Sequence, residues 1–295
     1  MTLLAALAGA VAISFSAILY ALAEVSPITG AFFRVFYALP ILFVLWWVRR
    51  REDHRTSNKK WIAVAAGIFL GLDILVWHIS IEYIGAGLST LIANSQVIVV
   101  AVIAWIFLGE RPSRQVAIAV PVVLIGVSLV SGLGRGDAFG SNPLLGTILA
   151  LASALLYAGF ILGFRMSNDI QAPSAGPLLE STAGAALAIL LAGTLTGGVE
   201  FTPTWPAHGW LLVLALSSQV AGWLLIGYAL PRLPAVETAT IILLQPVLTM
   251  IWAVLIFSES PSTIQWVGAA LVLSGVGFVA ISRARRTPEI APAQP

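Results

Sequence analysis

The stretch IGAGLSTLIANSQVIVVAVIAWIFLGERPSRQ, from Ile84 to Gln115, decides the fold of this chain. It is a long apolar run, interrupted by the polar residues Asn94–Gln96 and closed by a Gly-Glu-Arg-Pro turn. The stretch LPAVETATIILLQPVLTMIWAVLIFSESPSTI, from Leu233 to Ile264, repeats this pattern 149 positions later. A glutamine inside an apolar run, followed by Glu-x-Pro-Ser, rarely recurs by accident, so the sequence predicts two copies of one unit. The matching residues at this offset include Ala86/Ala235, Gln96/Gln245, Ala104/Ala253, Glu110/Glu259, Pro112/Pro261 and Ser113/Ser262.

The composition is that of a protein with many membrane spans. Hydrophobic residues make up 59% of the chain and charged residues 9%, whereas a soluble domain carries roughly 25% charged residues. Mean hydropathy is +0.98. The chain has no cysteine, which excludes disulfides, thiolate metal sites and cysteine nucleophiles. Its three histidines do not have the spacing of a metal motif, no GxxxxGK[ST] phosphate loop is present, and we expect no cofactor.

A helix that spans a membrane needs about 20 mainly apolar residues, and ten segments meet this requirement. With the N-terminus in the cytoplasm, 13 of the 15 basic residues fall in cytoplasmic segments and the outside loops hold only Arg135. We therefore expect both termini inside. The first span is expected to remain uncleaved, because no basic residue precedes it. The predicted spans cover residues 3–22, 29–48, 61–81, 86–108, 115–132, 143–164, 176–197, 209–230, 235–257 and 264–281.

Each predicted unit contains five helices, which is an odd number, so the second unit must enter the membrane upside down. This arrangement is the inverted repeat of secondary transporters, whose binding site lies near the midplane between the two halves. The first repeat is expected to cover residues 1–138 and the second residues 139–281. Residues 282–295 are polar and rich in proline, which predicts a disordered cytoplasmic tail.

The repeat resembles that of the EamA branch of the drug/metabolite transporter superfamily. The matching pieces are Ala86–Pro112 and Ala235–Pro261, each following a small-residue turn, together with Phe33-Arg34 in the second predicted helix. The second copy departs from the pattern, with Ser258-Glu259-Ser260 in place of Gly-Glu-Arg. The resemblance implies an all-α bundle of ten helices around a central cavity. It also implies a bacterial inner-membrane exporter of small metabolites, most similar to exporters of aromatic amino acids.

Polar side chains inside membrane helices are costly and usually face the bundle interior. Helix 61–81 carries the densest set, with Asp73 about 18 Å from the start of the span at Trp61. Asp73, Trp77 and Ser80 share one helix face, and His78 and Glu82 share a neighbouring face. These groups either line a substrate path or are satisfied by neighbouring helices, and Gln96 and Gln245 either face the cavity or join helices by hydrogen bonds. The predicted cavity residues are Asp73, Trp77, His78, Gln96, Tyr157, Trp223 and Gln245.

Arg34 and Glu180 occupy matching places in the two repeats, 146 positions apart. Inversion puts them near opposite membrane surfaces, so we do not expect them to pair. Arg34 either attracts a substrate carboxylate or is an anchor that pairs with a loop acid or a lipid headgroup, and Glu180 has the same alternatives. Glu110 and Glu259 are expected to cap helix ends or to meet basic loop residues.

The function that these features favour is export by alternating access. An enzyme is not expected, because the predicted spans lack a nucleophile–base pair and clustered metal ligands. The alternatives are a channel-like facilitator, or an exporter of nucleosides, polyamines or drugs. The expected partners are a small-molecule substrate, aromatic or neutral amino acids above all, and the lipid bilayer of the bacterial inner membrane. We expect no nucleic acid and a functional monomer.

Overall fold

The computed structural model describes residues 2–96, 98–99, 114–130, 138–168, 173–195, 197–229 and 244–284. These residues form helices joined by short turns, with no strand among them. The helices are α1 (Thr2–Ser14), α2 (Ser16–Ala23), α3 (Pro27–Phe36), α4 (Ala38–Arg49), η1 (Arg50–Glu52), α5 (Ser57–Ala93), α7 (Arg114–Val130), α8 (Pro143–Ser167), α9 (Ala175–Gly193), α10 (Ala207–Leu214), the π-helical η2 (Ala215–Gly222), α11 (Trp223–Ala229), α13 (Leu244–Phe257) and α14 (Thr263–Ala284).

Six helical segments of the described residues are long and apolar enough to cross a membrane, and they coincide with predicted spans. The described parts of three further predicted spans form shorter apolar helices, Ala117–Val130, Leu244–Phe257 and Thr263–Phe278. The number of ten spans stays a prediction, because the fourth and ninth predicted spans fall partly outside the described residues. α14 continues to Ala284, past the predicted end of the last span at residue 281. The six segments are Leu4–Ala23, Pro27–Glu52, Ser57–Ala93, Pro143–Phe164, Ala175–Gly193 and Ala207–Ile226.

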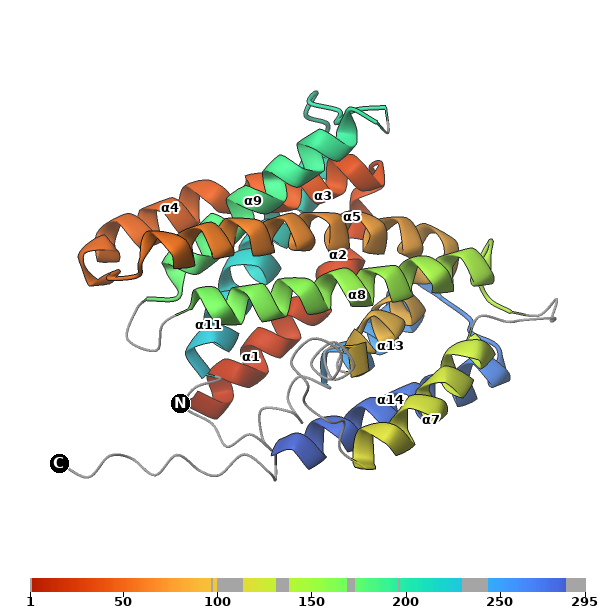
Figure 1. Ribbon diagram of the computed structural model, residues 1–295. Coiled ribbons are helices and arrows are strands. Elements are labelled where there is room, and N and C mark those ends of the chain that lie inside the picture. The colour runs from red at the N-terminus through yellow and green to blue at the C-terminus, as the bar shows by residue number, and fades with distance from the viewer. Residues whose placement is uncertain are drawn as a thin grey trace.

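The long helix α5 is the central element of the packing. It lies against α8 and α9, while α7 and α14 form a separate pair (Figure 1). Glycines set the approach between α5 and α9: a Cβ atom at Gly67 would overlap the backbone of Ser181, and one at Gly184 would overlap the backbone of Val64. Small residues of this kind let membrane helices pack backbone to backbone. The backbones of α5 and α9 therefore lie in close contact at these positions.

A break at Gly85 divides α5 at the point where the sequence predicts a new span. Gly85 has φ 78° and ψ 168°, outside the helical region. The Glu259 carboxylate lies against this break and accepts hydrogen bonds from the backbone N–H groups of Ala86 (2.6 Å) and Gly87 (3.3 Å). Burial raises the pKa of the Glu259 carboxyl, and these two hydrogen bonds oppose the rise. The expected capping role of Glu259 is confirmed; Glu110 lies outside the described residues.

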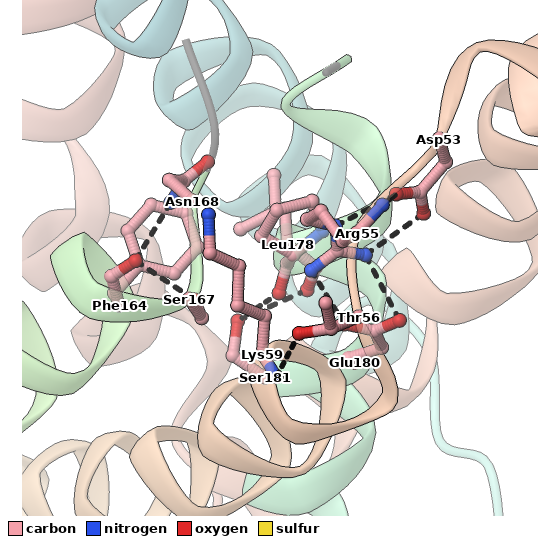
Figure 2. Close-up of polar contacts among 11 residues, drawn as sticks. Asp53, Arg55, Thr56, Lys59, Phe164, Ser167, Asn168, Leu178, Glu180 and Ser181 are labelled. Atoms are coloured by element: carbon pink, nitrogen blue, oxygen red, sulfur yellow. Dashed lines mark hydrogen bonds and ion pairs between the residues drawn. The ribbon is translucent and has the colours of Figure 1, made fainter. Parts of the chain in front are cut away.

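A buried charge cluster ties the start of α5 to the start of α9, as Figure 2 shows. Arg55 donates to both carboxylate oxygens of Asp53 (2.8 and 2.9 Å) and to both of Glu180 (2.8 and 2.9 Å). Its side chain is fully buried. Glu180 therefore pairs with a basic loop residue and not with Arg34, which confirms the anchor interpretation for Glu180. Burial opposes ionisation of Asp53, but its contacts with Arg55 outweigh that effect and hold its pKa below the ordinary value.

The charge cluster predicts a pH-dependent stability. A depressed pKa means that Asp53 stabilises the fold above its unfolded-state pKa of about 3.9 and that this contribution disappears as the pH falls through the lower folded-state value. Asp53→Asn should lower the free energy of unfolding by about 2 kcal/mol at pH 7. The difference should vanish in strong acid. Thermal unfolding of the purified protein, followed by tryptophan fluorescence at several pH values, measures it. Glu52→Gln is the control, because the Arg49–Glu52 pair is exposed. A difference independent of pH would contradict the assignment.

The break at Gly85 predicts a sharp response to a single methyl group. In Gly85→Ala the new Cβ would need a left-handed φ, which costs about 1–2 kcal/mol, and would overlap the Glu259 carboxylate. Gly197→Ala is the matched control: its φ is also positive, at 93°, but no described atom lies within 4 Å of the added Cβ. We expect the Gly85 variant to lose much more folded yield and thermal stability than the Gly197 variant. Equal losses would show that backbone strain alone matters.

Candidate functional site

A charged group lies in the interior of the bundle, on the short helix α3. Arg34 is 6% exposed, and its Nε donates a 3.4 Å hydrogen bond to Oε1 of Gln219. Gln219 lies in η2 and is itself held by a 3.3 Å hydrogen bond to Thr182 on α9. The guanidinium carbon of Arg34 lies 5.7 Å from the ring centre of Trp77 on α5. One neutral amide and one aromatic face therefore surround this cation.

Asp73 lies near Arg34 without forming an ion pair with it. Its Oδ1 accepts a 2.6 Å hydrogen bond from Ser153 on α8, and it interacts with Arg34 through the electrostatic field. Arg34 forms no ion pair with any carboxylate of the described residues, and its Nη1 has no hydrogen-bond partner among them. A buried charge without a partner is costly. The site thus holds a basic and an acidic group that attract each other at a distance but form no direct ion pair.

An aromatic wall from α8 and α11 borders the two charges. Tyr157 lies near both Asp73 and Arg34, and it contacts the side chain of Gln96. The Trp223 ring lies 6.3 Å from that of Tyr157 and 5.4 Å from that of Phe160, measured between ring centres. Gln96 is 7% exposed, and its Oε1 has no hydrogen-bond partner among the described residues. The wall therefore combines apolar ring surface with one free amide acceptor.

His78 lies beside Trp77, and Tyr20 lies between its ring and a separate cavity. Its ring stacks on Tyr20 with centres 3.7 Å apart, and Tyr20 donates a 3.3 Å hydrogen bond to Glu82. Neither ring nitrogen of His78 makes a well-formed hydrogen bond to a described residue. A cavity of about 430 Å³ opens on the other side of Tyr20, between the end of α2 and α5. The cavity is lined by Tyr20, Ala21, Glu24, Val25, Ser26, Ile81 and Glu82.

Irregular helix geometry positions two of the amides. Gln219 lies in a π-helical turn, a feature that is rare and frequent at functional sites. Gln96 follows a turn at Asn94 and Ser95, where the helix that begins after Gly85 is interrupted. Such breaks let a side chain leave the regular helix face and expose backbone groups to a cavity. Both amides thus reach the interior from helices that are locally distorted.

The structure brings together five of the seven predicted residues: Asp73, Trp77, Gln96, Tyr157 and Trp223. It places His78 next to Trp77, 5.4 Å away between ring centres, with its other face on Tyr20. Gln245 is half-buried on α13, and no contact among the described residues links its side chain to this group; its carbonyl accepts from Thr249, which also bonds Ser14. Ser153, Thr182 and Phe160 were not predicted, although Ser153 and Tyr157 share a helix face at i, i+4 spacing.

The contacts of Gln96 predict that transport is more sensitive to this residue than folding is. Gln96→Leu removes an amide that contacts Tyr157 and replaces it with an apolar group of similar size, which a buried position tolerates. We expect the transport rate per folded molecule to fall about tenfold, equivalent to about 1.4 kcal/mol. Gln245→Leu is the repeat-matched control and should have a smaller effect. The measurements are transport into proteoliposomes and folded yield by size-exclusion chromatography. Parallel losses of both quantities would favour a purely structural amide.

The comparisons with known proteins agree with a membrane transport fold. A model described as the EamA-like transporter family matches residues 1–132 and 144–281. An "Uncharacterized transporter" of Archaeoglobus fulgidus is 26% identical over 269 residues, which is 89% of this chain and 91% of the relative. The "Uncharacterized transporter YcbK" of Bacillus subtilis is 25% identical over 84% of this chain and 80% of the relative. A solved structure, described only as the crystal structure of a protein, has a TM-score of 0.62 at 17% identity and covers 97% of this chain and 98% of its own, which shows the fold alone.

Proposed function

The chain belongs to the EamA-like transporter family, and we propose that it exports small metabolites, above all neutral and aromatic amino acids, across the bacterial inner membrane. The observation that carries this proposal is the buried Arg34 and Asp73, which form no direct ion pair, beside the Tyr157–Trp223 wall. Such groups inside membrane helices mark substrate pathways, because lipid cannot solvate them. The aromatic rings suit a substrate that is partly apolar. The family and the relatives named as transporters support a membrane transporter.

The proposed mechanism is alternating access between two inverted five-helix repeats, residues 1–138 and 139–281, with both termini in the cytoplasm. The site draws its side chains from both repeats: Arg34, Asp73, Trp77 and Gln96 from the first, and Tyr157, Gln219 and Trp223 from the second. A rocking motion of one repeat against the other would open such a site to each side in turn. The outer cavity beside Tyr20 supports an exit on the side of the α2–α3 turn.

A counterflow experiment tests the proposal. Proteoliposomes that contain the purified protein and are loaded with an unlabelled amino acid should transiently accumulate the labelled amino acid from outside. A carrier exchanges labelled for unlabelled substrate before the gradient of unlabelled substrate has dissipated. Tryptophan, leucine, a nucleoside, a polyamine and a cationic drug should be compared as exchange partners. Saturable exchange of the amino acids supports the proposal. Flux without counterflow indicates a channel-like facilitator, and exchange of another class alone replaces the proposed substrate.

The aromatic wall predicts the effect of a single truncation on this exchange. Trp223→Ala removes a ring that packs on Tyr157 and Phe160, and aromatic contacts contribute about 0.5–1.5 kcal/mol beyond area burial. We expect tryptophan exchange per folded molecule to fall about tenfold or more. Trp61→Ala is the control, because Trp61 is 69% exposed at the start of a span, and it should leave exchange near the wild-type rate. Equal rates for the two variants would remove Trp223 from the site.

A further inference from the structure

We propose that Arg34 is the carboxylate anchor of the site, and that Asp73 and Gln96 receive the ammonium group, so that the transporter selects zwitterions over amines and over simple carboxylates. The proposal rests on the proposed transport function and deepens it, because it assigns the charge recognition to named atoms. It starts from Arg34, a buried arginine that forms no ion pair with any described carboxylate.

Two buried arginines of the same chain show the contrast. Arg55 is fully buried at the end of the bundle and donates four hydrogen bonds to two carboxylates, Asp53 and Glu180. Arg34 is also buried and lies inside a predicted span, yet its described partners are the neutral amide of Gln219 and the face of Trp77. An arginine stays protonated in a protein and offers a planar fork of donors that matches a carboxylate. The free Nη1 of Arg34 is therefore the donor that a substrate carboxylate would satisfy.

The other half of the site fits an ammonium group. The Asp73 side chain accepts a hydrogen bond from Ser153 and forms no ion pair with Arg34. Gln96 presents a buried Oε1 that has no hydrogen-bond partner in the part of the chain that the structure describes, and both Asp73 and Gln96 interact with the same residue, Tyr157. An ammonium group has three donors and needs acceptors of this kind. The carboxylate and the ammonium group of an α-amino acid thus find complementary groups within one site.

The Gln219–Thr182 pair keeps Arg34 available to a ligand. Gln219 accepts from Nε of Arg34 and donates to Thr182, so the amide is fixed with its oxygen toward the guanidinium. This contact orients the guanidinium through Nε, while Nη1 has no hydrogen-bond partner among the described residues. A site that holds a donor for a specific group discriminates strongly against ligands that lack it, since the donor then stays unpaired in a dry environment. An amine without a carboxylate would leave Arg34 in that state.

The test uses matched sets of compounds that differ in one charged group. The first set is tryptophan, tryptamine and indole-3-propionate; the second is leucine, isoamylamine and 4-methylpentanoate. Each compound competes against counterflow of the labelled amino acid in proteoliposomes of the full chain. For the wild type we expect the amino acid to compete at least 100-fold better than either of its analogues.

Two variants then separate the two ends of the substrate. Arg34→Gln should reduce the preference for tryptophan over tryptamine at least tenfold. Arg34→Lys should retain part of this preference, because lysine keeps the positive charge but lacks the planar, forked set of guanidinium donors. Asp73→Asn should instead reduce the preference for tryptophan over indole-3-propionate. If both variants exchange more slowly but keep the wild-type preferences among the three compounds of each set, the proposal is overturned and both groups are structural.

A binding measurement covers the case in which a variant does not fold. Wild-type protein in detergent should be stabilised against thermal unfolding by the amino acid and not by its amine or its acid analogue. Equal stabilisation by all three compounds overturns the charge assignment while leaving amino acid transport intact. The absence of both stabilisation and counterflow with every amino acid overturns the proposed substrate class itself.

Discussion

A hydrocarbon layer offers no hydrogen-bond partner and almost no solvation to a charge, and the organisation of this protein depends on that constraint. Every polar group in the spans must find a partner from the chain or from a ligand. Ser14, Ser80, Ser181 and Thr249 meet the requirement locally, through backbone carbonyl groups of their own or of a packed helix. Arg55 meets it with two carboxylates. Arg34 differs from Arg55, because its Nη1 has no hydrogen-bond partner among the described residues.

The same constraint explains where the helices break. A kink releases backbone N–H and C=O groups, and these must be satisfied within the protein. At Gly85 the released N–H groups of Ala86 and Gly87 are taken by the Glu259 carboxylate from the other half of the chain. A negative group is also favourable at this end of a helix, because the helix dipole is positive there. The break is therefore a place where the two halves of the chain are connected by hydrogen bonds. It also sets the direction of the helix that leads to Gln96.

Features that depend on short stretches of sequence were predictable, whereas those that depend on tertiary packing were not. The six long apolar spans, the break before Ala86 and the pairing of Glu180 with a loop base follow from length, composition and local charge. Ser153 and Thr182 escaped prediction, because small hydroxyl residues are common in membrane helices. Only the packing of α8 against α5 brings Ser153 to Asp73, and only the packing of η2 against α9 brings Gln219 to Thr182. Gln245 was expected beside Gln96 because the two match in sequence. A matching position in a repeat does not imply a matching environment, and here Pro246 follows Gln245 while the helix break precedes Gln96.

The two repeats differ most where charge is concerned, and this difference bears on how a substrate is held. Arg34 and Glu180 occupy corresponding places, yet one faces the interior site and the other pairs with Arg55 at the end of the bundle. Asp73 likewise has a glycine, Gly222, at the corresponding position in the second repeat. Under the proposed inversion, a site with equivalent charges in both halves would hold a zwitterion equally well in two opposite orientations. Because the charges lie in the first repeat alone and the amide of Gln219 comes from the second, a substrate has one favourable orientation. It can keep that orientation while the two halves move around it.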